Sequence, residues 1–290
     1  MPMKIYEEKG NLILKGVRDF DLLMTFDCGQ CFRWEKVDNA YYGIAYGKPL
    51  KISQTGDTVT LYDTTKDCWN KVWNRYFDME RDYGEIKKRL SSDPVMKTAS
   101  YFGSGIRLLN QEPFECLISF IISASNNIPR IKKIIDSLCT NFGDKVTYLG
   151  KDFYTFPTAQ RLSRLELSDL AVIKAGFRDK YILNAAKAVA NGMIDLECLK
   201  SAGYEYAKSE LLKLSGVGNK VADCVLLFSL EKYGSFPVDV WIKRIMEYCY
   251  FDGETNKETI SAFAGEKFSE LGGFAQQYLF YWARENNIGI

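Results

Sequence analysis

The pattern of hydrophobic and polar residues changes about one third of the way along the chain. Up to about residue 95, hydrophobic and polar positions alternate in short segments rich in Tyr, Val, Ile and Thr, namely ILKGVRDF, FRWEKV, YYGIAYGKPLKISQ and TVTLYD. Helical spacing appears there only in DCWNKVWNRYFDM and in IKKRLSSD, which stops before Pro94. This pattern predicts a small α+β domain with an antiparallel sheet over residues 1–98.

From about residue 96 onward, hydrophobic residues recur every three or four positions, which is the period of an amphipathic helix. The helical segments are FECLISFIISAS, PRIKKIIDSLCTNF, SRLELSDLAVIKAG, RDKYILNAAKAVANG, YAKSELLKL, DVWIKRIMEYCY and EKFSELGGFAQQYLFYWAREN. Several begin after Pro, Ser or Asp and end at a glycine, such as Gly143, Gly176 or Gly192. We therefore expect residues 99–290 to form an all-helical part.

Composition narrows the functional classes. The 290-residue chain has a net charge of +1, so a nucleic-acid ligand would have to be bound by local patches and helix N-termini. The chain contains no histidine, which excludes most zinc sites and catalytic triads. No apolar run approaches the roughly 20 residues that cross a bilayer, and the N-terminus does not resemble a secretory signal. We expect a cytoplasmic protein with no membrane partner.

Cys28-Gly-Gln-Cys31 is the one cysteine pattern that suggests a metal or redox site. A structural zinc needs four ligands, and no second cysteine pair has a matching spacing. The eight cysteines are otherwise scattered, which is typical of buried thiols in a reducing compartment. We expect neither a metal nor a cofactor, with a thiol redox or metal protein built on Cys28 and Cys31 as an alternative.

The stretch ELLKLSGVGNKVADCVLL, residues 210–227, contains a glycine turn between two helical segments. Gly216 and Gly218 frame the turn, and Lys220 and Val221 open the next helix. A Walker loop is excluded because it needs four residues between its glycines and Ser or Thr after the lysine. Amides at such a helix start suit a phosphate, so the turn fits a helix-hairpin-helix clamp on a DNA backbone. It fits a plain helical hairpin with an exposed lysine equally well.

A second motif, PVDVWIKRI at residues 237–245, adds a carboxylate. Asp239 precedes an amphipathic helix and has the residue type of an N-cap. A lysine at one helix start and an aspartate at another, on the same cleft, form an amine nucleophile with its electrostatic partner. This combination favours the DNA clamp over the plain hairpin.

LSGVGNKVADC and FPVDVWIKRI together resemble the helix-hairpin-helix, glycine/proline-rich loop and aspartate superfamily of DNA glycosylases. CGQCFRW, QEPFECLISFIISASNNIPRI, AGFRDKY and FAQQYLF extend the resemblance to its 8-oxoguanine glycosylase/lyase branch, in the family's order over residues 28–280. The four-cysteine tail of the iron–sulfur members is absent. The resemblance implies an N-terminal domain like the TATA-binding protein, a helical core of two subdomains, and a helix-hairpin-helix over about 204–230.

The resemblance also implies a bifunctional DNA glycosylase/AP lyase that flips 8-oxoguanine out of duplex DNA and excises it. Lys220 would attack the sugar and form a Schiff base, and Asp239 would stabilise the positive charge that develops on the sugar. The Gly29 carbonyl would accept the N7 hydrogen that guanine lacks, and Gln276 would read the Watson–Crick edge. The remaining residues implied to surround the base are Cys224, Phe228, Pro237 and Phe280.

The duplex-binding residues implied by the family fall into three groups. Asn126, Asn127, Arg130 and Arg178 match the residues that fill the vacated space and read the orphan cytosine. Ser125, Phe177 and Trp241 stand where the more familiar members carry Asn, Tyr and His, while Gly216, Gly218 and Val221 belong to the phosphate-binding hairpin. We expect some preference for cytosine opposite the lesion, and a monomer, because one cleft suffices for binding.

Two further alternatives remain at this point. The first is a glycosylase for a different damaged purine, such as an alkylated one. The second is a non-catalytic helix-hairpin-helix module that binds DNA without releasing a base. The module leaves Asp239 and the distant pocket motifs unexplained.

Overall fold

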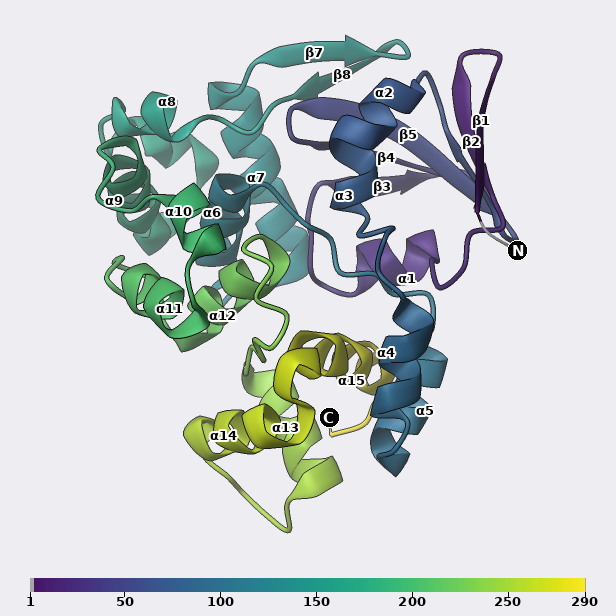
Figure 1. Cartoon of the computed structure of the whole chain (residues 1–290). Helices are drawn as coiled ribbons and strands as arrows, with labels where there is room; N and C mark the ends of the chain where they lie inside the picture. The colour runs from purple at the N-terminus through teal and green to yellow at the C-terminus, as the bar shows by residue number, and fades with distance from the viewer. Residues whose placement is uncertain (1–2, 290) are drawn as a thin grey trace.

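The computed structural model describes residues 3–289 and shows a sheet beside two groups of helices (Figure 1). The sheet is antiparallel, with the strand order β1-β2-β6-β5-β4-β3. Its strands are β1 Lys4–Glu8, β2 Asn11–Lys15, β3 Trp34–Val37, β4 Ala40–Ala45, β5 Lys48–Thr55 and β6 Thr58–Leu61. The predicted antiparallel sheet in the first third of the chain is confirmed.

Alternation along the strands builds the core of the sheet region. Leu12, Leu14, Leu50 and Ile52 are fully buried on one face and pack with aromatic residues from short helices that follow β6. Those helices are α2 Lys66–Cys68, a π-helical turn Trp69–Trp73, and α3 Asn74–Tyr76. The strand-to-helix change near residue 66 therefore agrees with the helical spacing predicted for DCWNKVWNRYFDM.

Helix α1, Leu22–Asp27, was not predicted, and the expectation that helix is absent before residue 67 is wrong. Six residues are too short to show a helical period. The helix is fixed instead by contacts, because the Asp21 carboxylate accepts the Met24 amide at 2.9 Å and Phe26 stacks on Trp34 with ring centroids 4.2 Å apart.

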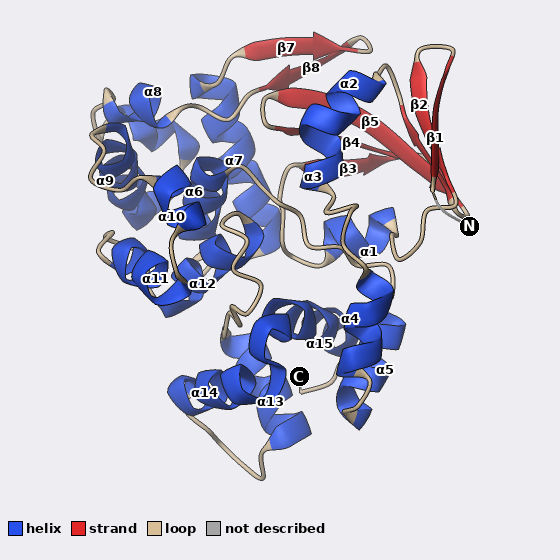
Figure 2. Ribbon diagram, viewed as in Figure 1, coloured by secondary structure: helices blue, strands red, loops and turns tan. Residues whose placement is uncertain are grey.

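The helices form two groups on opposite sides of a central gap between ribbons (Figure 2). The first group is α6 Pro113–Ser123, α7 Ile128–Phe142, α8 Ala159–Ser163, α9 Asp179–Ala190, α10 Leu196–Ser201, α11 Tyr204–Leu212 and α12 Asn219–Phe228. The second is α4 Tyr83–Leu90, α5 Pro94–Phe102, α13 Val240–Tyr250, α14 Lys257–Phe268 and α15 Gly272–Asn286. Buried residues of both groups belong to one continuous hydrophobic core.

Two details of the helical region differ from the sequence expectation. A hairpin of β7 Lys145–Tyr148 and β8 Lys151–Tyr154 interrupts the helices, because Leu149 and Gly150 both have positive φ and form a tight turn. The helix predicted over SRLELSDLAVIKAG is replaced by the end of α8 and two 3₁₀ turns, Asp169–Ile173 and Gly176–Arg178. Hydrophobic spacing alone did not distinguish these short turns from a helix.

Helices α4 and α5 come from the N-terminal side of the chain but pack with the C-terminal helices. Tyr83, Ile86 and Met96 lie in the helical core, and α5 lies along α15. The predicted domain boundary at residue 98 falls inside α5 and stays a prediction. Among residues 3–289, none of the helices has both the length and the hydropathy needed to cross a bilayer.

Candidate active site

The α11–α12 hairpin presents free backbone amides at the start of α12. Gly216 has a φ of +86°, and a Cβ there would lie 2.5 Å from the Tyr181 ring, so only glycine fits. Gly218 is the N-cap of α12 and makes no side-chain cap hydrogen bond, while a Cβ on it would meet nothing within 4 Å. The first amides of α12, that of Val221 included, are therefore left without a side-chain cap at the positive end of the helix.

Lys220 lies in the first turn of α12 and is partly buried. Its Nζ donates to the Ser123 hydroxyl at 3.2 Å and lies 5.0 Å from the centre of the Phe120 ring. Both contacts come from the C-terminal half of α6, which packs directly against α12. The amine is therefore held by a neutral hydroxyl and a ring face.

Asp239 is the N-cap of α13, as predicted. Its Oδ1 accepts the Ile242 amide at 2.8 Å, which fixes the carboxyl group at the helix start. Its other oxygen, Oδ2, makes no hydrogen bond within residues 3–289, and Asp239 forms no ion pair with Lys220 there. One oxygen thus caps α13, and the other stays available to a ligand.

Lys220 and Asp239 line the same small cavity, of about 50 Å³. We call it the lysine cavity and define it by the residues that line it, which are Cys28, Gly29, Phe120, Lys220, Cys224, Phe228, Pro237, Asp239, Gln276, Gln277 and Phe280. The structure thereby brings together every residue predicted to be catalytic or to contact the base. These predicted residues come from the loop after α1, from α12 and α15, and from the segment that leads into α13.

Gly29 sits in a loop that is braced from behind. It has a φ of +80°, and a Cβ on it would lie 3.3 Å from the Phe280 ring. Next to it, the fully buried Gln30 donates to the carbonyls of Thr25 and Arg107, both at 2.8 Å, and accepts the Leu109 amide at 2.9 Å. These bonds fix the direction in which the Gly29 backbone points.

Helices α12 and α15 contribute Cys224, Phe228 and Phe280 to the lining of the lysine cavity. Cys224 is buried, and burial raises the pKa of its thiol to about 12, against the opposing effect of Lys220. The thiol therefore stays protonated and does not compete with Lys220 as a nucleophile. Phe228 stacks on Phe120 with centroids 5.5 Å apart, so it is also part of the core, while Phe280 is only partly buried.

A second cavity, of about 360 Å³, adjoins the lysine cavity on the outer side. Both are lined by Gly29, Phe120, Lys220, Asp239 and Phe280. The lysine cavity has the volume of one or two waters, so a purine ring requires it to widen. Phe280 contacts both spaces and is the least buried aromatic residue between them.

Asn126, Asn127 and Trp241, which line this second cavity, belong to a second set of predicted residues. We call this set the outer rim and define it as Ser125, Asn126, Asn127, Arg130, Phe177, Arg178 and Trp241. Two of its amide side chains are used within the protein. Asn126 donates to the Ile122 carbonyl at 3.0 Å, and Asn127 caps α7 by accepting the Arg130 amide at 3.0 Å. Ser125 is exposed with a φ of +50°, which marks a sharp local turn. Filling of a vacated duplex position by these residues stays a prediction.

The two arginines of the outer rim differ in exposure. Arg130 is exposed, whereas Arg178 is only 2% exposed. The Arg178 guanidinium donates to the carbonyls of Ala124, Ser125 and Ala175 at 2.6–3.2 Å, and burial together with the Arg130 charge lowers its pKa. Arg178 therefore holds the loop that carries Ser125. Its predicted contact with cytosine stays a prediction and requires these hydrogen bonds to break.

Phe177 and Trp241 are the exposed aromatic members of the outer rim. Phe177 is 59% exposed and stands against Tyr181, and Trp241 is 45% exposed in the first turn of α13. Exposed large aromatic residues on a soluble protein often mark a binding surface.

The remaining cysteine motif does not form a reactive site. Cys28 and Cys31 are buried and unbridged, and burial raises the pKa of both thiols, that of Cys28 to about 12. Over residues 3–289, no three residues among Cys, Asp and Glu are grouped in a way that could hold a metal ion. The geometry thus favours a loop-forming role for CGQC over a redox role.

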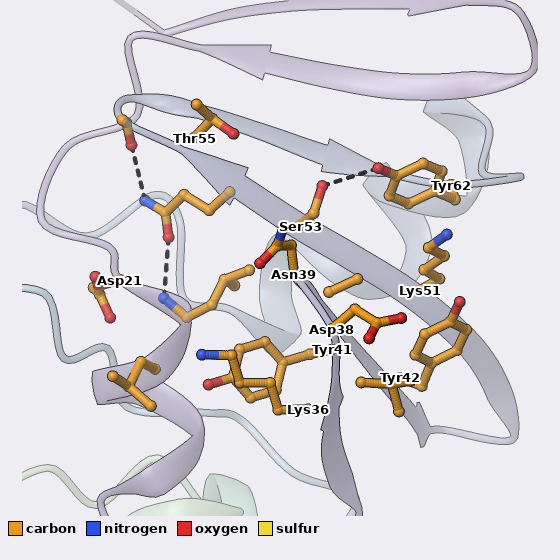
Figure 3. A pocket seen from close by; sticks show the side chains of 16 residues that line it. Asp21, Lys36, Asp38, Asn39, Tyr41, Tyr42, Lys51, Ser53, Thr55 and Tyr62 are labelled. Atoms are coloured by element: carbon orange, nitrogen blue, oxygen red, sulfur yellow. Dashed lines mark hydrogen bonds between the residues drawn. The ribbon is translucent and has the colours of Figure 1, made fainter.

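A pocket of about 730 Å³, larger than either of these cavities, lies elsewhere, against α1 and strands β3, β4 and β5. Figure 3 shows its labelled side chains, which include Asp21, Lys36, Tyr42, Lys51 and Tyr62. None of the predicted site residues lines it. Volume alone therefore does not locate the active site in this fold.

The sequence prediction missed three residues of the site. Phe120 and Ser123 contact the Lys220 amine, and Gln277 lines the lysine cavity beside Gln276. FECLISFIISAS offered only its helical spacing, which marks core positions. Gln277 had one available signal, because a second glutamine follows Gln276 inside an otherwise apolar helix segment.

Comparisons with known proteins agree with this geometry. Residues 12–117 match the family model of the 8-oxoguanine DNA glycosylase N-terminal domain, and residues 118–270 match that of the HhH-GPD superfamily of base excision DNA repair proteins. A probable N-glycosylase/DNA lyase of Methanothermobacter thermautotrophicus is 31% identical, with 94% of this chain and 96% of that protein covered.

Solved structures give the same result. The Clostridium acetobutylicum 8-oxoguanine glycosylase/lyase, in complex with double-stranded DNA containing cytosine opposite 8-oxoguanine, is 47% identical with a TM-score of 0.96; 98% of this chain and 99% of that chain are covered. MBOgg1, in complex with a low-affinity DNA ligand, is 44% identical with a TM-score of 0.97, and 99% and 100% of the two chains are covered.

Proposed function

Because this chain belongs to the HhH-GPD superfamily of base excision DNA repair proteins, we propose that it is a bifunctional DNA glycosylase/AP lyase that excises 8-oxoguanine from duplex DNA. The observation that carries the proposal is the lysine cavity, in which Lys220, Asp239, Gly29 and Gln276 meet from four distant segments. A DNA-binding module without catalysis has no use for this convergence.

The chemistry follows from the amine of Lys220. The flipped nucleotide places its anomeric carbon at the cavity, where neutral Nζ forms a C–N bond as the glycosidic bond breaks. The departing base keeps the electron pair of that bond and takes up the proton that the attacking nitrogen releases. Opening of the sugar ring gives a Schiff base, and loss of a C2′ proton then expels the 3′ phosphate by β-elimination. The last step cuts the strand.

Asp239 assists by its charge and its fixed position. Its Oδ1 is held by the Ile242 amide, so the carboxylate does not have to reorganise during the reaction. A preorganised carboxylate stabilises the positive charge that develops on the sugar as the base departs.

Recognition of the lesion divides between Gly29 and α15. The Gly29 carbonyl, on its braced loop, would accept the N7 hydrogen of 8-oxoguanine, and Gln276 would bind the Watson–Crick edge. Cys224 and Phe280 would lie against the two faces of the ring, with Phe228 and Pro237 at its edge. Guanine offers no N7 hydrogen, so the same carbonyl would be left unpaired, at a cost of about 1–3 kcal/mol.

The duplex would be held by the α12 amides and the outer rim. The uncapped start of α12 suits a phosphate, and Arg130 is free to contact the orphan cytosine. Phe177 and Trp241, both exposed, would contact bases or sugars beside the flipped nucleotide. One cleft binds one lesion, so we expect the active form to be a monomer. Sedimentation of the protein with and without DNA tests this expectation.

Borohydride trapping on an 8-oxoguanine duplex tests the proposed function. The wild-type protein should form a covalent protein–DNA adduct, and Lys220→Gln should abolish it, since only a Schiff base is reduced to a stable bond. Lys213→Gln is a matched control, because Lys213 lies on the same hairpin but is exposed and paired with Glu210. A Lys220→Gln protein that still forms the adduct would refute the nucleophile, and release of no base by the wild type would refute the glycosylase.

A further inference from the structure

One residue that lines the lysine cavity has a polar atom that the reaction described so far does not use. Gln277 is 3% exposed, and its Oε1 is buried without a hydrogen-bond partner within residues 3–289. Its Nε2 donates to the Oε1 of Gln276 at 2.7 Å. A buried carbonyl oxygen without a hydrogen-bond donor is rare in folded proteins and is destabilising.

A glutamine with only a structural role looks different in the same molecule. Gln30 is fully buried, and both ends of its amide are paired, with Thr25, Arg107 and Leu109 as partners. Gln277 has one end paired and the other end orphaned, and it lines a cavity. The missing partner of Gln277 is therefore expected to arrive with a ligand.

We infer that Gln277 is a second base-reading residue, whose Oε1 accepts a hydrogen of the exocyclic 2-amino group of the flipped purine. This inference rests on the proposed function, since it concerns the base that enters the lysine cavity. The Watson–Crick edge of a guanine-type base presents an acceptor, O6, followed by two donors, N1–H and N2–H.

The two glutamines offer the complementary order. Gln276 contributes Nε2 as a donor and the second lone pair of its Oε1 as an acceptor, because Gln277 occupies the first. The orphaned Oε1 of Gln277 is the next acceptor. The sequence of donor, acceptor and acceptor matches O6, N1–H and N2–H, whereas an adenine-type edge has no amino group at C2.

The hydrogen bond between the two side chains adds a positioning effect. Donation from Gln277 Nε2 fixes the Gln276 amide with its oxygen toward Gln277, so its nitrogen is the end left for O6. Both side chains are nearly buried, Gln276 at 6% exposure, and an amide held in a low-dielectric cavity discriminates strongly between donors and acceptors.

A single-turnover experiment with two lesions isolates this contact. 8-Oxohypoxanthine has the same ring, N7 hydrogen, O6 and N1–H as 8-oxoguanine but lacks the 2-amino group. Each is placed opposite cytosine and excised by the wild type, by Gln277→Leu and by Gln276→Leu. We expect the wild type to excise 8-oxoguanine about tenfold faster, equivalent to about 1.4 kcal/mol.

The two variants should then behave differently. In Gln277→Leu the tenfold ratio should fall to about one, because neither lesion retains a partner for the amino group. In Gln276→Leu both rates should fall while the ratio persists, since both lesions share O6 and N1–H. An unchanged ratio in Gln277→Leu would overturn the inference.

The wild-type comparison stands by itself if a variant fails to fold. Equal excision of the two lesions by the wild type would overturn the inference while leaving the proposed function intact. Failure to excise 8-oxoguanine at all would instead refute the proposed function. Thermal melting of each variant separates a lost contact from a lost fold.

Discussion

The lysine cavity and the outer rim lie next to each other but are built in different ways. Cavity groups are fixed before any ligand arrives, as Asp239 is by its cap and Gly29 is by the bracing of Gln30. The outer rim instead combines exposed side chains, Phe177 and Trp241, with amides that are folded back onto the protein. The comparison indicates that the catalytic groups of the lysine cavity are preorganised, whereas the contacts between the outer rim and the duplex form on binding.

The largest expected effect tests the preorganised side. Asp239→Asn keeps the N-cap of α13, because asparagine caps helices as well as aspartate does, but it removes the charge. We expect the single-turnover rate of base excision to fall by about 10²–10³, with the melting temperature and the affinity for undamaged duplex unchanged.

Asp195→Asn is the matched control for that variant. Asp195 caps α10 by accepting the Cys198 amide at 2.9 Å, and it does not line the lysine cavity. The control should keep the wild-type rate. Equal losses in the two variants would show that the loss does not come from the charge in the cavity, which would then have no catalytic part.

The sequence predicted the cavity better than the rim, for a physical reason. Lys220, Asp239, Gly29 and Gln276 each lie in a motif whose residue types are dictated by a turn, a cap or a base contact. Such local requirements are visible in the order of residues. Their meeting in one cavity rested on the family resemblance, because no spacing shows that α15 returns to the loop after α1.

Features that depend on packing were not visible in the sequence. Arginine is a residue type that is usually exposed, yet Arg178 is buried against the carbonyls of a loop 53 and 54 residues away in the sequence. The β7–β8 hairpin has strands of four residues, too short for a convincing alternation. Gln277 stands out because its Oε1 has no hydrogen-bond partner, which only the three-dimensional structure shows.

A smaller effect is expected at the outer rim, where variants of the two arginines should differ in how their excision rates depend on the opposite base. Arg130→Ala removes an exposed guanidinium, so we expect about tenfold loss of excision opposite cytosine and little loss opposite other bases. Arg178→Lys weakens the hold on Ala124 and Ser125, so we expect a several-fold loss that is equal opposite all four bases. Single-turnover rates with each opposite base measure both.

The rim prediction has a clear contrary result. If Arg178→Lys loses its rate only opposite cytosine, its guanidinium must leave the loop carbonyls and read the base in the complex. Arg178→Ala adds a second test, since the loop should then become more accessible to hydrogen exchange at Ala124 and Ser125. Undisturbed exchange there would refute the loop-holding role.

The smallest expected effect concerns Glu112, the N-cap of the helix that supports both regions. Helix α6 carries Phe120 and Ser123 toward the cavity and leads into the loop of the rim, and Glu112 caps it by accepting the amides of Phe114 and Glu115. Burial raises the pKa of Glu112 from 4.5 to about 7, against the opposing effect of these hydrogen bonds. The group therefore titrates near neutral pH in the folded protein.

The sign of the pH dependence follows from proton binding. Between pH 4.5 and 7 the unfolded chain has released the Glu112 proton while the folded protein keeps it, so raising the pH lowers the free energy of unfolding. Glu112→Gln retains an accepting oxygen but cannot titrate, and should flatten this decline by on the order of 1–3 kcal/mol. Urea unfolding at several pH values measures the slope, with exposed Glu258→Gln as control. Because glutamine still accepts the amides that cap α6, the variant should leave the excision rate and the opposite-base ratio unchanged at neutral pH. A slope equal to that of the wild type would show that Glu112 is already ionised in the folded protein.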